Sequence, residues 1–203
     1  MRARRPSGRL ARELHGHASM KIFLAVVSAV GALAGCTSSS EVTSIQGGTV
    51  AGVSFAVVDG AAMVRTSRGL TNIVLTDFAD ACAIADESSR PSSKQLTFLI
   101  SDDVGAGSTG TPPSKPGTYT VTSLANLPAS GPGAECGFAV LDATCRASTS
   151  ASCDSGTVTL SRVDATGYAG TFDVVIAGAH VTGGFDVPSC SDGNSESGFG
   201  TCQ

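Results

Sequence analysis

The residue types that could carry acid–base chemistry are few, and His180 is the first to consider because it is the only histidine after residue 35. A general base needs a nucleophile and an orienting acid within hydrogen-bond reach. The motifs Gly-x-Ser-x-Gly, Ser-x-x-Lys and His-Glu-x-x-His are all absent. We therefore interpret His180 as a half-exposed strand residue and expect the protein not to be an enzyme.

Two acidic segments could bind metal or pair for catalysis. The segment Asp192-Gly-Asn-Ser-Glu196 alternates oxygen side chains, but Ser197 and Gln203 stand where a calcium loop needs its sixth-position glycine and its closing glutamate. Asp102 and Asp103 are adjacent, so in a strand end they would point to opposite faces, which makes them a poor candidate for paired carboxylate catalysis. The sequence predicts no metal site and no cofactor.

Six cysteines follow Cys36, and their even number predicts disulfide bonds in an exported chain. They are Cys82, Cys136, Cys145, Cys153, Cys190 and Cys202. We favour the pair Cys145 with Cys153, because these residues flank a loop between two expected antiparallel strands. Cys190 and Cys202 bracket a Gly- and Ser-rich tail, and each could instead pair with Cys82 or Cys136.

The stretch from Met20 to Cys36 has the pattern of a secretory signal peptide. One lysine precedes about a dozen apolar residues, fewer than the roughly 20 that a transmembrane helix needs. Its end, Leu33-Ala34-Gly35-Cys36, resembles the lipobox of bacterial lipoproteins. That resemblance implies cleavage before Cys36 and acylation of its thiol and new amino terminus, which is a stable membrane anchor. Thr37, in place of Asp, implies sorting to the outer membrane.

Residues 1–35 form the expected signal peptide, with Met20 as an alternative start. They hold six of the 13 Lys and Arg residues and one of the 17 Asp and Glu residues, which leaves 7 against 16 and a net charge of −9. An acidic chain disfavours nucleic acid as a partner. The expected partners are the membrane, through the lipid, and an envelope protein of unknown identity.

Residues 36–48 are polar and aperiodic, so we expect a lipidated flexible tether, and residues 49–203 form a single β-domain. The domain has no Trp and is rich in Gly, Ser, Thr, Ala and Val, a composition typical of β-structure with many turns. We predict an all-β fold, an antiparallel sandwich or barrel of about eight or nine strands with one short helix.

The clearest strands lie between Gly156 and Pro188, where apolar residues alternate with polar ones in three successive runs. Gly170-Thr-Phe-Asp-Val174 returns as Gly183-Gly-Phe-Asp-Val187, and a turn is expected near 177–179. Further expected strands are 49–58, 61–66, 70–76, 95–101, 115–122 and 136–143. A turn is expected at Asp59-Gly60, and the helix is expected over 77–87 with Asp77 as N-cap and Cys82 facing inward.

The organisation resembles uncharacterised bacterial lipoproteins in which a lipobox, a Ser-rich tether and one β-domain with paired Gly-x-Phe strands end in a cysteine. The resemblance implies location and architecture but no activity. We therefore expect a lipid-anchored structural or interaction module of the cell envelope. The alternative is a small-ligand carrier whose barrel or sandwich encloses a cavity.

Overall fold

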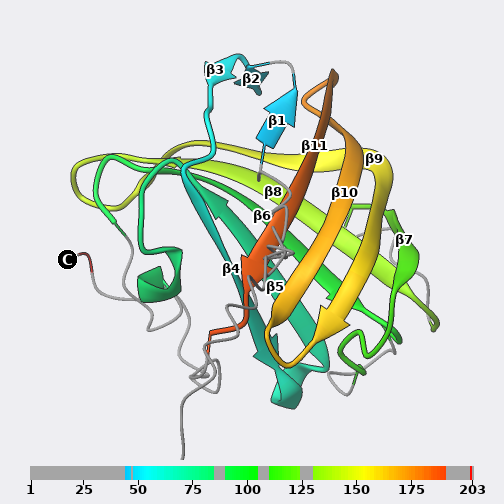
Figure 1. Cartoon of the computed structure of the whole chain (residues 1–203). Coiled ribbons are helices and arrows are strands. Elements are labelled where there is room, and N and C mark those ends of the chain that lie inside the picture. Colours follow the sequence, from blue (N-terminus) through cyan, green and yellow to red (C-terminus); the bar gives the residue numbers. More distant parts are fainter. Residues whose placement is uncertain are drawn as a thin grey trace, which may run out of the picture. The chain divides into compact units, whose positions relative to one another are not determined.

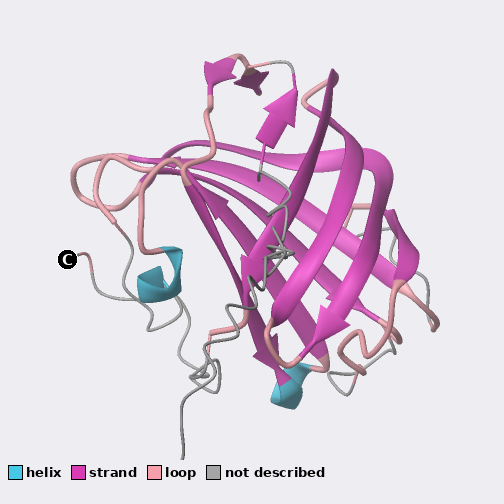
Figure 2. Ribbon diagram, in the orientation of Figure 1, coloured by secondary structure: helices cyan, strands magenta, loops and turns pink. Residues whose placement is uncertain are grey.

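The computed structural model describes residues 44–46, 48–84, 90–104, 110–123, 130–190 and 202. All of them belong to one compact unit, Ser38–Gln203. Its strands are β1 (Ser44–Gln46), β2 (Thr49–Val50), β3 (Val53–Ser54), β4 (Asp59–Arg65), β5 (Leu70–Thr76), β6 (Lys94–Ser101), β7 (Gly117–Val121), β8 (Gly133–Leu141), β9 (Ala147–Asp164), β10 (Gly167–Ile176) and β11 (Ala179–Pro188). The fold is all-β, as the composition predicts (Figure 2).

Nine strands form one curled sheet in the order β1-β11-β10-β9-β7-β8-β6-β5-β4, and β2 pairs with β3 in a separate two-stranded sheet. Neighbours are antiparallel except β7 and β8, which pair in parallel at Val121 and Ala134. The long strand β9 bends so that its first part pairs with β8 and its second part with β7 and β10 (Figure 1). At the end of β11, Ser189 bridges Ala62 of β4, which brings the two sides of the half-barrel together.

The core lies inside the curl and is filled by large side chains. The ring of Phe98 on β6 lies 5.0 Å from that of Phe172 on β10 and 6.4 Å from that of Phe185 on β11. These strands are not neighbours in the sheet, so the contacts cross the interior. Phe98 and Phe185 are fully buried and Phe172 is 3% exposed.

The meander predicted between Gly156 and Pro188 is confirmed, with β9 beginning earlier than expected. Each phenylalanine of the Gly-x-Phe repeat faces the glycine of the other copy, because antiparallel register pairs Gly170 with Phe185 and Phe172 with Gly183. Both turn residues, Ala177 and Gly178, have positive φ, as a tight two-residue hairpin turn requires.

The expected boundary between tether and domain is wrong. Ser44, Ile45 and Gln46 form β1 and pair with Thr182 to Gly184 of β11, so the β-domain begins before residue 49. Edge strands leave a row of backbone groups unpaired, and a short neighbouring segment can satisfy them. A strand of only three residues is too short to show the alternation of apolar and polar residues that predicts a strand. The predicted boundary therefore lies too late in the chain.

The expected turn at Asp59-Gly60 is also wrong, because both residues begin β4. A Cβ atom on Gly60 would lie 2.6 Å from Cγ1 of Val187, so the glycine permits a close approach of β11 rather than a turn. The turn in this region is Ala51-Gly52, which joins β2 to β3 with positive φ at both residues.

The helix expected over 77–87 is a short 3-10 segment, Ala81–Ile84, and residues 85–89 lie outside the described part of the chain. Asp77 is not its N-cap: the Asp77 carboxylate accepts a hydrogen bond from the backbone N–H of Lys94 at 2.8 Å. The backbone N–H of Ala81 instead donates to Asp59 at 2.9 Å. A second 3-10 segment, Thr66–Arg68, joins β4 to β5, so the expectation of one helix is wrong as well.

Candidate functional site

A hollow of about 350 Å³ opens on the outer face of the sheet, over β6, β8 and the first part of β9. Register places its lining residues in rows across these strands. Thr97, Gly137 and Ser152 stand side by side in one row, and Leu99 and Glu135 stand side by side in the next. Small side chains at the centre and larger ones at the edge make the surface concave, with Gly137 as its floor.

The floor of the hollow is open at Gly137 because glycine has no side chain to fill it. The nearest atom to a Cβ atom built on it is the backbone oxygen of Ala151 at 3.6 Å, an ordinary contact distance. The floor is therefore open because the residue is glycine, not because the backbone requires one.

Glu135 supplies the charge of the hollow. Burial raises the pKa of its carboxyl above the ordinary value. None of the described residues donates a hydrogen bond to this carboxylate or forms an ion pair with it. A partly desolvated carboxylate without a partner is uncommon in a folded protein.

A second hollow, of about 330 Å³, lies where β7 begins, between Lys115, Pro132 and the acidic residue Asp102. The hydroxyl of Tyr119 donates to Asp102 at 2.6 Å, and the backbone N–H of Ser114 donates to the same carboxylate at 3.2 Å. Burial, followed by the hydrogen bond to Asp102, raises the pKa of Tyr119 far above its ordinary value. This tyrosine stays protonated and serves to position the loop before β7.

Asp102 and Asp103 have separate partners, as the alternation of a strand predicts. While Asp102 binds Tyr119, Asp103 accepts a hydrogen bond from the backbone N–H of Gly131 at 2.8 Å. The two carboxylates each hold a loop in place.

His180 lies on the exposed face of β11 with its Nε2 atom 2.7 Å from Oδ1 of Asp173 on β10. The two side chains are 66% and 58% exposed. No other described side chain is bonded to either residue. The pair is a cross-strand contact on a solvated face, which agrees with the expected surface position of His180.

The six cysteines form three disulfides, but the favoured pair is wrong. Cys145 bonds to Cys202 and Cys153 bonds to Cys136, while Cys82 bonds to Cys190. Cys153 is 1% exposed and faces the core of the half-barrel beside Cys136 on the neighbouring strand, whereas Cys145 lies in the loop that precedes β9. Flanking a loop in sequence does not place two side chains on the same face of a sheet.

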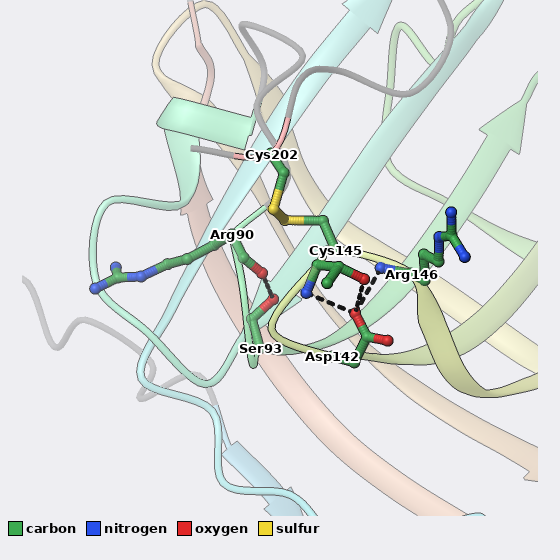
Figure 3. Close-up of a disulfide and its surroundings, with 7 residues drawn as sticks. Arg90, Ser93, Asp142, Cys145, Arg146 and Cys202 are labelled. Carbon is green, nitrogen blue, oxygen red and sulfur yellow. Dashed lines mark hydrogen bonds between the residues drawn. A yellow bond between two sulfur atoms is a disulfide. The ribbon is translucent and has the colours of Figure 1, made fainter.

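The Cys145–Cys202 disulfide fastens the chain near its C-terminus to the β8–β9 loop (Figure 3). In this loop Oδ1 of Asp142 accepts hydrogen bonds from the backbone N–H groups of Thr144 and Arg146, at 2.7 and 3.0 Å, and from the Thr144 hydroxyl. The Thr144 hydroxyl contributes most to lowering the pKa of Asp142. Cys145 has a φ of +58° in the same loop. The carboxylate organises the loop so that Cys145 points toward Cys202.

Cys36, the signal segment and the Asp192–Glu196 segment lie outside the described residues, so the expectations for them stay predictions. Across the described ranges, no group of three or more His, Cys, Asp or Glu side chains is placed to hold a metal ion. No helix in the same ranges has the length and apolarity to cross a bilayer.

The hollow around Glu135 was not predicted from the residue pattern. An isolated glutamate in an apolar strand is a weak signal, and the small residues opposite it are reached only through the pairing of β8 with β6 and β9. The available signal was the interruption of the apolar run 133–141 by Glu135 and Gly137.

Comparisons of the chain with protein-family models, with curated proteins and with solved structures found no match.

Proposed function

We propose that this protein is a lipid-anchored interaction module of the bacterial cell envelope, without catalytic activity. The lipobox-like segment ending at Cys36 supports the anchor. The observation that carries the proposal is the pairing of β1 with β11, because the chain enters the sheet at Ser44, only eight residues after Cys36. A flexible segment of that length spans roughly 15 Å. The anchor would therefore hold the domain against the membrane surface.

The direction of β1 selects the end of the domain that faces the bilayer. β1 lies beside the middle of β11, and because it is antiparallel to β11, Ser44 is at the end of β1 that points toward the side of the sheet where β11 finishes, β4 joins β5 and β9 joins β10 (Figure 1). We call this the tether end. The hairpin turn at Ala177-Gly178 and the β8–β9 loop lie at the opposite end and would face outward.

Charge supports this orientation. Four cations and four acids lie at the tether end, namely Arg65, Arg68, Lys115, Arg162, Asp102, Asp103, Asp164 and Asp186. Elsewhere in the described chain three cations stand against seven acids, so the excess negative charge lies away from the tether end. An anionic headgroup layer repels the acidic parts of the domain and tolerates the neutral end.

A small-ligand role is the second candidate. The rings of Phe98, Phe172 and Phe185 occupy the interior where a barrel carrier would hold its ligand. The hollow over Gly137 is instead open at the surface, and this one observation favours a ligand there.

Replacing Cys36 with Ser tests the anchor. We expect the Cys36→Ser variant to be absent from the membrane fraction, because acylation needs the thiol. The variant should remain folded. Cys202→Ser is the matched control, since it removes another sulfur and leaves the lipobox intact. Fractionation followed by immunoblotting gives the answer. Recovery of Cys36→Ser in membranes after a high-salt wash would refute the lipid anchor.

A further inference from the structure

Glu135 differs from the other acids of the described chain. Nine of the 11 described acids accept a hydrogen bond or form an ion pair: Asp59, Asp77, Asp102, Asp103, Asp142, Asp154, Asp164, Asp173 and Asp186. Of the remaining two, Asp80 is exposed to water, which solvates its charge. Glu135 alone is partly buried without a partner.

The surroundings of Glu135 are uncharged. From β6 the hollow receives Thr97 and Leu99, and from β9 it receives Ser150 and Ser152. None of these side chains titrates, and Cys136 beneath them is held in a disulfide. The next acid along β9, Asp154, is engaged by the backbone N–H of Gly178 at 3.1 Å. Among the described lining residues, the charge of the hollow is therefore that of one carboxylate.

We propose that the hollow over Gly137 binds a protonated primary amine carried on a short alkyl chain, with the ammonium group at Glu135. The ammonium would supply the ion pair and hydrogen bonds that the carboxylate lacks, in a place where water is partly excluded. This inference does not depend on the lipid anchor. It concerns a site on the outer face of the sheet rather than the tether end.

The shape of the hollow suits the alkyl part of such a ligand. Glu135 and Gly137 are two positions apart on β8, so the floor lies about 7 Å from the charged group along the strand. Leu99 stands beside Glu135 and offers an apolar wall, and Thr97 stands beside Gly137. A volume of about 350 Å³ is near the lower limit for small-molecule sites. A linear amine of a few carbons fits a space of this volume.

The test uses the purified full chain and hexylamine, with hexanol and hexanoate as probes of the same length. Isothermal titration at pH 7 should detect hexylamine and show binding at least tenfold weaker for the other two. Glu135→Gln should weaken hexylamine binding at least tenfold, because it keeps the shape and removes the charge. Asp154→Asn, the control, should leave the affinity unchanged.

A second variant tests the floor independently of the charge. Gly137→Val fills the hollow at a position where a Cβ atom meets no close contact, so folding should be retained, as circular dichroism can check. It should also weaken hexylamine binding at least tenfold. Equal binding of hexanol and hexylamine, or full affinity in both Glu135→Gln and Gly137→Val, would overturn the proposal.

The source of the amine is distinguished with Nα-acetyl-lysine amide, whose only amine is on the side chain. Binding as strong as that of hexylamine would identify a lysine side chain of a protein as the ligand. Binding of hexylamine alone would identify a free small amine. Binding of either probe should weaken as the pH falls and Glu135 becomes protonated, and binding that is unchanged at acid pH would count against the ion pair.

Discussion

Glycines stand inside strands in two parts of the sheet, and the space above them is used in opposite ways. In the meander, a Cβ atom on Gly183 would lie 2.5 Å from the Phe172 ring, and one on Gly170 would lie 3.0 Å from the Phe185 ring. On β8, a Cβ atom on Gly137 would meet nothing closer than 3.6 Å. The first two glycines are covered by aromatic rings, and the third is an open floor.

Whether the space above each glycine is filled depends on which face of the sheet that space lies on. Gly170 and Gly183 lie opposite phenylalanines whose rings face the core, where close packing leaves no voids. Gly137 pairs with Thr97 and Ser152 on the outer face, and neither side chain extends over it to close the hollow. The cross-strand neighbours of a strand glycine therefore decide whether the space above it is filled or open. The local sequence does not show which residues these neighbours are.

The largest expected effect concerns the packed glycines and their rings. Phe185→Ala should lower the free energy of unfolding by about 3–5 kcal/mol, because lost burial and an unfilled cavity add. Thr171→Ala, on the exposed face of the adjacent strand, is the control and should change it by about 0.5 kcal/mol or less. Urea unfolding of both variants measures the difference. Similar losses would mean that the two faces of the meander are assigned the wrong way round.

A smaller loss is expected when the glycine itself is enlarged. Gly170→Ala places a Cβ atom 2.2 Å from the backbone oxygen of Thr159, and a strand cannot yield there without shifting. Overpacking of this kind typically costs about 1–3 kcal/mol. The change in urea midpoint at constant slope reports it. A neutral result would show that β9 and β10 are farther apart at this position than the register implies.

Much of the meander could be predicted from sequence because its alternation of apolar and polar residues is strict. Val158, Phe172 and Val187 are all buried as the period of two requires. Asp186 shows the limit of the same rule: it alternates outward, yet its carboxylate pairs with Arg162 on β9. A face can be read from periodicity, but a partner two strands away in the sheet cannot.

The remaining errors share a physical cause, which is contact between segments distant in the chain. The Cys82–Cys190 bond spans 108 residues, and β1 joins a strand that follows it by more than 130 residues. Gly60 permits the approach of Val187, and this contact with a distant strand is not visible in the local Asp-Gly pair that predicts a turn. The hollow around Glu135 has the same cause, because it exists only once β6 and β9 flank β8.

The open glycine should respond in the opposite direction to the packed ones. Gly137→Ala should raise the free energy of unfolding by about 0.5–1 kcal/mol, because alanine restricts the unfolded chain and fills no occupied space. The same urea experiment that measures Gly170→Ala measures this gain, so the two variants form a matched pair. A loss of stability in Gly137→Ala would show that the floor is packed and that the hollow does not exist as described.

The smallest effect tests whether the hollow excludes water from Glu135. Burial raises the pKa of this carboxyl in the folded protein, so the folded state holds the proton more tightly than the unfolded chain does. The site therefore adds most to stability below its unfolded pKa, and that contribution is lost as the pH rises through the folded pKa. Glu135→Gln does not titrate.

At pH 7 the Gln variant should be more stable than the wild type by up to about 0.5 kcal/mol, because the wild type then carries a partly desolvated charge. The advantage should shrink as the pH falls and the wild-type carboxyl takes up its proton. Thermal melts at several pH values, with Asp80→Asn as an exposed control that should show no such trend, measure this difference. The stability difference between Glu135→Gln and wild type could instead stay constant from pH 7 to pH 4. That result would mean that water solvates Glu135 fully. The outer hollow would then be ordinary solvated surface, unlike the packed face of the meander, and would not bind a ligand.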